Sequence, residues 1–416
     1  MRITMLTIGS TGDVRPYILL GLELQSRGHN ITIATFSRFR EMIEKEGIHF
    51  FPLSGDAEKL MSSIMSPSSS GITYLSRLEK SIKSVAPQLI QDMADSCASA
   101  DAMICNFFGS VYYSIAEKYN IPCIQTHFFP MDPTRNQPIS SVRHQHLGAV
   151  LNESTYRVGY LLISTVEKHY LTPWRKKNGV SLRHIKSLPD YRAGNHPIPV
   201  IYAVSPLIMP RPADWNSHIQ MSGFWFDESP VSWSPPADLE SFLSREPVAP
   251  IYIGFGSMTG HSMNRLMAIV LHTLHSSGTR AIVNLGWSGQ QLRSNHAVYF
   301  TNYISHDWLF PRVRAVVHHG GAGTTAAGLR YGRPTLTIPF AGDQSFWGNR
   351  VHALGCGPRP IARDKLTVQN LTKALLDINN HYESYASEAG KIMNGLAQEH
   401  GVSTAADQIE AEIARW

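Results

Sequence analysis

The sequence has little of several features that would point to other classes of protein. Its 416 residues include four cysteines and no Cys-x-x-Cys pair, which argues against a disulfide framework or a zinc site and favours buried free thiols. No segment approaches the roughly 20 apolar residues of a membrane span. No run of basic residues suggests nucleic-acid binding, and no Asp-x-Asp string offers a carboxylate pair for magnesium.

The N-terminus lacks the apolar region and cleavage site of a signal peptide, because its first eight residues are short and strand-like. We therefore expect a cytoplasmic protein. The formal net charge of +5 is mild for this length, and it allows weak peripheral contact with an anionic inner membrane face.

Strand-like and helix-like segments alternate from the start of the chain. Strands are expected at 3–8, 31–35 and 48–51, with helices at 16–26 and 37–46, and the pattern resumes from 101 to 125. The Ser-rich segment 62–71 between them is expected to be a mobile loop. Alternation with short turns predicts a parallel, doubly wound α/β sheet.

A second alternating region follows a proline-rich stretch. We predict a Rossmann-like domain over 1–205, a stiff linker over 206–247, a second Rossmann-like domain over 248–395, and a C-terminal helical segment, 396–416, that packs back on the first domain. Ligands of such sheets bind outside the carboxyl ends of the strands, so we expect the site in a cleft between the two domains.

A glycine run in the second half is the strongest chemical signal. His318-His319-Gly320-Gly321-Ala322-Gly323-Thr324-Thr325 stands where a buried strand passes into a helix. Backbone N–H groups at such a helix N-terminus favour an anion, and we expect a diphosphate. Downstream, Asp343 and Gln344 are suited to holding sugar hydroxyls, although an aspartate before a helix is also a common N-cap.

Five segments between residues 9 and 351 together resemble inverting nucleotide-sugar glycosyltransferases of the GT-B fold, in particular sterol glucosyltransferases and bacterial enzymes that glycosylate natural products. These segments are GSTGDVRPYILLGLELQSRGH, SPLIMPRPADWN, IYIGFGSM, SHDWLFPRV and HHGGAGTTAAGLRYGRPTLTIPFAGDQSFWGNRV. The resemblance implies two facing Rossmann-like domains, the first for the acceptor and the second for the donor. It also implies metal-independent transfer of glucose from UDP-glucose to a lipophilic acceptor such as a sterol, with no tightly bound cofactor.

The resemblance also places a donor site in the second domain. In relatives the matching positions contact the diphosphate, the hexose or the base. Here they are Gly256, Ser257, Tyr303, His306, His319, Gly321, Gly323, Thr324, Asp343 and Gln344. Tyr303 stands where plant relatives have a base-stacking tryptophan, and its alternative interpretation is a core aromatic. Trp347 stands where plant relatives have an asparagine.

On the acceptor side, the resemblance makes Asp13 the general base that takes the proton of the acceptor hydroxyl. The alternative is a helix cap, because Asp13 comes just before an expected helix. The surrounding glycine loop comprises Ser10, Thr11 and Gly12. The expected acceptor-binding residues are Phe107, His127 and Phe128.

Other functions remain open on the sequence. A natural-product glycosyltransferase would take a UDP- or dTDP-sugar to a macrolide, glycopeptide or phenol. A nucleotide-sugar 2-epimerase would use the same architecture without an apolar acceptor pocket, and the aromatic residues of the first half argue against it. A non-catalytic nucleotide-sugar-binding protein would not need Asp13.

Overall fold

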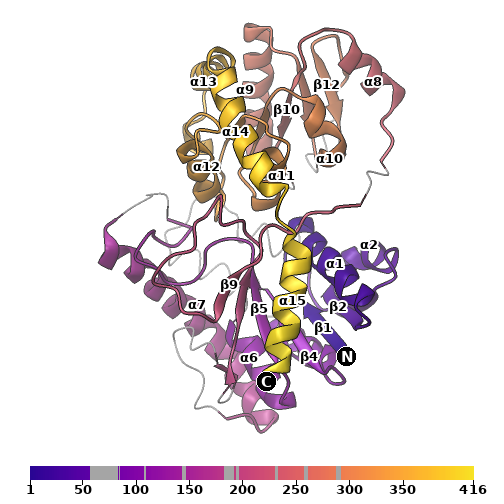
Figure 1. The fold of residues 1–416 in the computed structure, drawn as a ribbon, viewed down its shortest axis with the longest axis vertical. Coiled ribbons are helices and arrows are strands. Elements are labelled where there is room, and N and C mark those ends of the chain that lie inside the picture. Colours follow the sequence, from indigo (N-terminus) through magenta and orange to yellow (C-terminus); the bar gives the residue numbers. More distant parts are fainter. Residues whose placement is uncertain are drawn as a thin grey trace. The chain divides into compact units, whose positions relative to one another are not determined.

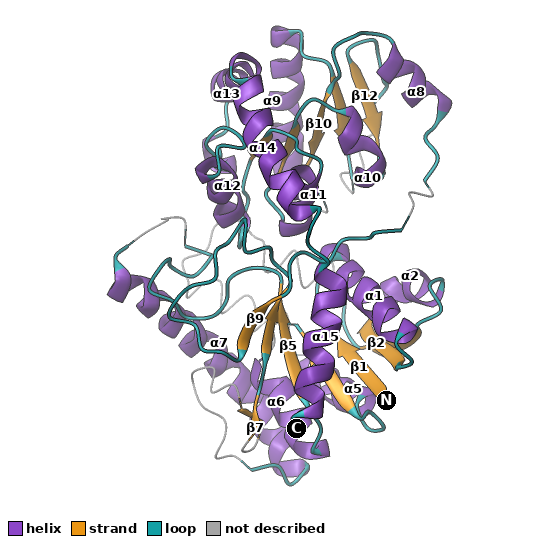
Figure 2. Cartoon of the chain, in the orientation of Figure 1, coloured by secondary structure: helices purple, strands orange, loops and turns teal. Residues whose placement is uncertain are grey.

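The computed structural model describes residues 1–56, 83, 85–106, 109–142, 147–181, 192–193, 196–229, 233–256, 261–286 and 292–416. The chain divides into two compact units. The first comprises residues 1–206, 210–227 and 399–416, and the second comprises residues 207–209 and 228–398. In each unit the strands are flanked by helices (Figures 1 and 2).

The first unit is built on a parallel sheet, with the strand order β3-β2-β1-β4-β5-β8-β9 in its described part. The interior strand β1 is buried after Arg2, and its Met5 pairs with Ile33 of β2 on one side and with Ile104 of β4 on the other. The strands are β1 (Arg2–Leu6), β2 (Asn30–Phe36), β3 (His49–Leu53), β4 (Ala102–Cys105), β5 (Cys123–His127), β8 (Val200–Tyr202) and β9 (Ile219–Met221), with a separate antiparallel pair β6 (Arg192–Ala193) and β7 (His196–Pro197).

Helices supply the rest of the first core, since Tyr17, Leu20 and Leu24 of α1 pack with the buried residues of the sheet. The helices of this unit are α1 (Thr11–Ser26), α2 (Arg40–Glu44), α5 (Ala86–Ser96), α6 (Gly109–Tyr119), α7 (Ala149–Lys177) and α15 (Gly401–Ala414), with a 3₁₀ turn at Ser37–Phe39.

The second unit holds a smaller parallel sheet of the order β12-β11-β10-β13-β14. Its strands are β10 (Ile251–Gly254), β11 (Ala281–Asn284), β12 (Val298–Thr301), β13 (Val316–His318) and β14 (Thr335–Thr337). Its helices are α8 (Ala237–Ser244), α9 (His261–Ser277), α10 (His306–Leu309), α11 (Ala322–Arg330), α12 (Gln344–Ala353), α13 (Val368–Asn380) and α14 (Tyr382–Leu396), with 3₁₀ turns at Phe310–Arg312 and Arg363–Lys365.

The predicted fold class, two doubly wound parallel sheets, is confirmed. All four cysteines are buried and free, as expected. Two local predictions were wrong. The first helix begins at Thr11 rather than at Pro16, because Ser10 caps it, and the expected helix over 37–46 is a 3₁₀ turn followed by the short α2.

The proline-rich stretch 206–247 is more than a linker. It contains β9, which pairs with β8 in the first sheet, and α8, whose Leu239 and Phe242 are buried in a core of the second unit. A strand of three residues among prolines gives too short a hydrophobic pattern to be recognised in the sequence.

Helix α15 belongs to the first unit and packs beside α1 (Figure 1). Arg27, which follows α1, forms ion pairs with Asp407 at 2.5 Å and Glu410 at 2.9 Å. His29 Nε2 also lies 2.8 Å from a carboxylate oxygen of Glu410. The contacts of α15 therefore join two ends of the chain that are nearly 400 residues apart in sequence.

Candidate functional site

The glycine turn after β13 places backbone donors at the start of α11. Gly320 has φ +90°, and the first helical hydrogen bond runs from Thr325 N–H to the Gly321 carbonyl at 2.9 Å. The N–H groups of residues 322–324 precede that bond, and no side chain among the described residues caps them at Gly321. Together with the helix dipole they form the kind of site that binds an anion.

The imidazole of His319 lies between two glycines at this turn. A Cβ added to Gly256 would come within 2.9 Å of the ring, and one added to Gly321 within 2.5 Å of Nε2. Gly256 also has φ +62°, a conformation that favours glycine. Any larger residue at either position would therefore displace the His319 ring.

Burial sets the charge state of both histidines of the turn. Burial, together with a smaller contribution from His306 and against the opposing effect of the Gly254 backbone, lowers the pKa of His319 to about 4. Burial also holds the pKa of His318 well below its usual range. His318 Nδ1 accepts the Gly320 N–H at 3.0 Å, so this histidine shapes the turn. His319 Nδ1 is buried and has no partner of good hydrogen-bond geometry in the described part of the chain.

His306 begins α10 and is held by aromatic neighbours. Its ring stacks on Phe310 with centroids 4.4 Å apart, and its Nε2 lies 3.2 Å from the Tyr252 hydroxyl. Tyr252 was not predicted as part of the site. It precedes Gly254 by two residues in β10, and a Cβ on Gly254 would meet its hydroxyl at 2.1 Å. The period of two in a strand, which puts Tyr252 on the same face as Gly254, is the signal that could have identified it.

The acid and the amide at the start of α12 have different partners. Asp343 Oδ2 accepts the indole N–H of Trp347 at 2.6 Å and does not cap the helix. Gln344 is buried, and its Oε1 accepts the backbone N–H groups of Phe340 at 2.7 Å and Ala341 at 3.2 Å. The carboxylate is thus oriented by the buried Trp347, and the Gln344 side chain has its amide N–H groups to offer a ligand.

The remaining predicted donor residues differ in their surroundings. Tyr303 is 64% exposed in the loop after β12, so its interpretation as a core aromatic was wrong. Thr324 is half-buried and Gly323 exposed in the first turn of α11. Ser257 lies outside the described residues. The described donor residues all follow the carboxyl ends of β10, β12, β13 and β14, the edge at which parallel sheets bind ligands.

In the first unit, Asp13 is the third residue of α1 and takes part in its capping box. Its Oδ2 accepts the Ser10 N–H at 2.6 Å and the Ser10 hydroxyl at 2.9 Å, while the Ser10 hydroxyl accepts the Gly12 N–H at 3.3 Å. Burial raises the pKa of Asp13, and the two bonds from Ser10 oppose that rise. Asp13 therefore lies inside the helix rather than before it, and Thr11 and Gly12 form its first turn.

Gly9 allows this arrangement, because a Cβ at that position would lie 2.2 Å from Asp13 Oδ2. Near Asp13, the ring of Tyr17 contacts the half-buried Phe128 at 5.9 Å and Trp225 at 6.1 Å between centroids. Trp225 was missed in the sequence because it lies in the stretch expected to be a linker. Phe107, also expected near the acceptor, lies outside the described residues.

His127 does not present its ring to a ligand, contrary to expectation. The residue ends β5 and its side chain is 1% exposed. Its Nε2 lies 3.0 Å from the Gln125 amide nitrogen and 3.9 Å from Asp132 Oδ2. Burial lowers the pKa of His127 to about 3, which makes it a weak base at neutral pH. It belongs instead to a buried polar network in which Tyr202 donates to Asp132 at 2.5 Å.

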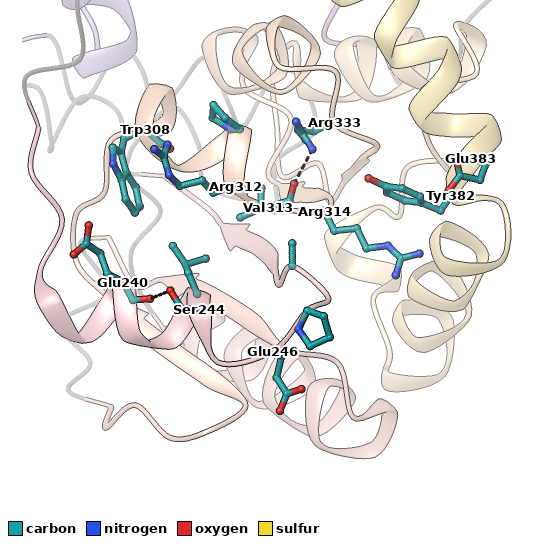
Figure 3. A pocket seen from close by; sticks show the side chains of 14 residues that line it. Glu240, Ser244, Glu246, Trp308, Arg312, Val313, Arg314, Arg333, Tyr382 and Glu383 are labelled. Atoms are coloured by element: carbon teal, nitrogen blue, oxygen red, sulfur yellow. Dashed lines mark hydrogen bonds between the residues drawn. The ribbon is translucent and has the colours of Figure 1, made fainter.

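A cavity of about 900 Å³ lies elsewhere in the second unit (Figure 3). It adjoins residues that precede β10, β13 and β14, at the opposite edge from the glycine turn, and none of the predicted donor residues lines it. Its walls include Arg312 over the Trp308 ring at 4.4 Å and Arg314 over the Tyr382 ring at 4.3 Å. Trp308 thus packs with Arg312 and with Trp233, at 5.2 Å between ring centroids.

Comparison with known proteins identifies the family. Residues 3–137 match the glycosyltransferase family 28 N-terminal domain, and residues 288–410 match the erythromycin biosynthesis protein CIII-like C-terminal domain. Two sterol 3-beta-glucosyltransferases of Arabidopsis thaliana are 34% and 32% identical, over 97% and 99% of this chain and 64% and 68% of their own lengths. The chain belongs to the GT-B glycosyltransferases.

A sterol 3-beta-glucosyltransferase of Candida albicans is 33% identical over 99% of this glycosyltransferase chain, which spans 28% of that protein. Solved structures show the same fold. The calicheamicin glycosyltransferase CalG4 aligns with a TM-score of 0.72 at 16% identity, covering 100% of this chain and 98% of its own. The Streptomyces glycosyltransferase SsfS6, complexed with thymidine diphosphate, aligns with a TM-score of 0.66 at 18% identity, covering 99% of each chain.

Two further findings concern the described part of this glycosyltransferase chain. Within it, no helix has the length and apolar character that crossing a membrane requires. The same residues contain no group of three or more His, Cys, Asp or Glu side chains arranged to hold a metal ion. Catalysis without a metal stays a prediction, which chelation tests directly.

Proposed function

We propose that this chain catalyses the inverting transfer of glucose from UDP-glucose to the hydroxyl of a lipophilic acceptor such as a sterol. The observation that carries the proposal is the uncapped N-terminus of α11 beside the neutral His319, in a chain that aligns over nearly its whole length with sterol 3-beta-glucosyltransferases. We assign each part of the proposed reaction to backbone or side-chain groups of the described residues.

The departing nucleoside diphosphate must be stabilised. As the glycosidic bond breaks, negative charge grows on the nucleoside diphosphate. The amides of residues 322–324, the Thr324 hydroxyl and an N–H of His319 would stabilise that charge. His319 is well suited to this because its ring is fixed between Gly256 and Gly321 and need not reorganise during the reaction.

Recognition of the sugar would fall to Asp343 and Gln344. A hexose hydroxyl can donate to the Asp343 carboxylate, which Trp347 orients, and another can accept from the Gln344 amide. Because such groups would lose their partners with a deoxysugar, the site should reject donors that lack these hydroxyls.

The acceptor hydroxyl must lose a proton as it attacks the anomeric carbon, and Asp13 would accept it. Burial raises the pKa of this carboxyl, which makes it a stronger base than an exposed aspartate. The aromatic side chains of Tyr17, Phe128 and Trp225 offer apolar surface for a lipophilic acceptor. Attack opposite the leaving group would give a β-glucoside from an α-linked donor.

A second candidate is a natural-product glycosyltransferase that uses a dTDP-sugar. It is favoured by the fold comparison, which includes SsfS6 with thymidine diphosphate and VinC with dTDP, the latter at a TM-score of 0.69 and 16% identity. The exposed Tyr303 can stack on either uracil or thymine.

The test is a matrix of donors and acceptors. The protein is incubated with UDP-glucose or a dTDP-deoxyhexose and with a sterol, a macrolide or a phenol, and products are identified by mass spectrometry. We expect a sterol hexoside from UDP-glucose. Glycosides formed only from the dTDP-sugar would favour the second candidate, and a changed donor sugar without any acceptor product would indicate an epimerase.

A further inference from the structure

Helix α7 exposes aliphatic side chains on the face that points away from its own unit. Val150, Leu151, Val158 and Leu161 are 75%, 60%, 57% and 53% exposed. The opposite face is buried, with Asn152, Tyr156 and Leu171 almost wholly inaccessible to solvent. The helix runs along the outside of the first unit (Figures 1 and 2) and packs on α5 and α6.

The four aliphatic residues share one face. At 100° per residue they fall within an arc of about 100° over the first half of the helix. In the second half the same arc carries Lys168, His169 and Lys176. We call this arc, with its aliphatic and basic halves, the α7 face.

Acidic residues are absent from the α7 face. The two acids of the helix, Glu153 and Glu167, fall about 60° and 100° beyond its edge at the same geometry. Glu153 is paired with two arginines beside the face, Arg157 at 2.6 Å and Arg135 at 3.2 Å, whose side chains are 63% and 67% exposed. The charge along and beside the α7 face is therefore positive.

We propose that the α7 face is a docking surface for an anionic lipid bilayer. The aliphatic half would enter the boundary between headgroups and acyl chains, while Lys168 and Lys176 would lie at the level of the phosphates, as in amphipathic helices that bind membranes in the plane of the interface. The positive charge selects this occupant over a second copy of the chain, because two copies meeting through this face would bring like charges together. The proposal stands apart from the proposed function, since it concerns the protein without donor or acceptor.

The experiment is flotation of the full chain with vesicles of phosphatidylcholine alone or mixed with phosphatidylserine. We expect binding to the mixed vesicles that weakens with added salt. The double substitution Val158→Asp/Leu161→Asp should lower the partition coefficient about tenfold or more. Lys168→Gln and Lys176→Gln should each lower it about fivefold, and only for vesicles with phosphatidylserine.

A matched control is available on the second unit. Val248 is 57% exposed and Leu376 is 50% exposed, so Val248→Asp/Leu376→Asp adds the same charges at equally exposed aliphatic positions. This control should bind vesicles like the wild type, and circular dichroism should show both double variants folded. Equal binding by all variants, equal loss in the control, or no binding by the wild type would overturn the proposal. Sedimentation that shows a wild-type dimer abolished by Val158→Asp/Leu161→Asp would assign the face to a second copy instead.

Discussion

Asp13→Asn separates the two roles that the structure gives to one carboxylate. In the capping box Asp13 Oδ2 accepts two hydrogen bonds from Ser10, and an asparagine oxygen can accept both. As a general base the carboxylate must take a proton, which an amide cannot do. The substitution therefore keeps the cap and removes only the proposed chemistry.

The two roles predict effects of very different size. The cost to folding should stay below about 1 kcal/mol, because an asparagine at this third helical position can accept the same two hydrogen bonds from Ser10. The loss of the base should lower kcat by roughly 10²- to 10⁴-fold, which corresponds to about 3 to 5 kcal/mol in the activation barrier. Asp13→Ala provides the comparison, because it removes the capping bonds as well and should cost about 1 kcal/mol more in stability.

The assay combines turnover, donor binding and thermal unfolding. Asp13→Asn should be inactive, should bind UDP-glucose like the wild type, and should melt within a few degrees of it. Ser10→Ala gives an independent check. The Ser10 hydroxyl lowers the pKa of Asp13, so its removal should raise that pKa and shift the acidic limb of kcat/KM to higher pH, since activity falls as pH drops through the pKa of the base.

Near-normal turnover by Asp13→Asn would refute the reasoning and leave Asp13 as a cap alone. An unchanged acidic limb in Ser10→Ala would show that this limb reports another group. His127 is an unsuitable substitute, because its ring is buried and its pKa lies at about 3.

Further predictions concern the donor site, the metal and stability. His319→Ala should lower kcat/KM for the donor about 10²- to 10³-fold with little change in the KM of the acceptor, and a change of only a few-fold would leave it a structural residue. Asp343→Asn should lower kcat/KM for UDP-glucose at least about tenfold while affecting a deoxysugar donor less; equal losses would argue against a contact with a hydroxyl. Turnover should continue in excess EDTA. A loss of turnover that added magnesium restores would contradict this prediction. Burial raises the pKa of Asp132 to about 7, so the folded state keeps a proton that the unfolded chain loses above about pH 4. The free energy of unfolding of the wild type should therefore decrease as the pH rises from about 4 to about 7. Asp132→Asn should abolish that fall, which is worth at most about 3 kcal/mol between pH 5 and pH 8, in denaturant titrations at these two pH values.

The repeated strand and helix pattern was enough to predict both sheets, because parallel strands are continuous apolar runs and their helices have their own period. It could not predict β9, which is three residues long and lies among prolines, and so Trp225 was assigned to a linker. The start of α1 was missed because Pro16 was read as a first-turn residue, whereas the capping box at Ser10 and Asp13 begins the helix five residues earlier.

At the site, the glycine turn was predictable from residue types, because a β-branched run, a run of glycines and a helix-forming segment follow one another there. The environment of single side chains could not be predicted from residue types. Nothing in the sequence distinguishes the buried ring of His127 from a ring that faces a ligand, and Tyr303 was as plausible in a core as in solvent. The partnership of Trp347 with Asp343 follows from their spacing of four residues at the start of a helix.

The position of α15 has a consequence for how the chain acquires its structure during synthesis. The second unit is almost wholly encoded between residues 228 and 398, whereas the first needs residues on both sides of that interval. On the ribosome, the amino-terminal sheet emerges first, but Arg27 must wait for its partners Asp407 and Glu410, which are made almost last. A chain truncated after residue 398 would contain the whole second unit attached to a first unit whose α1 lacks its partner helix.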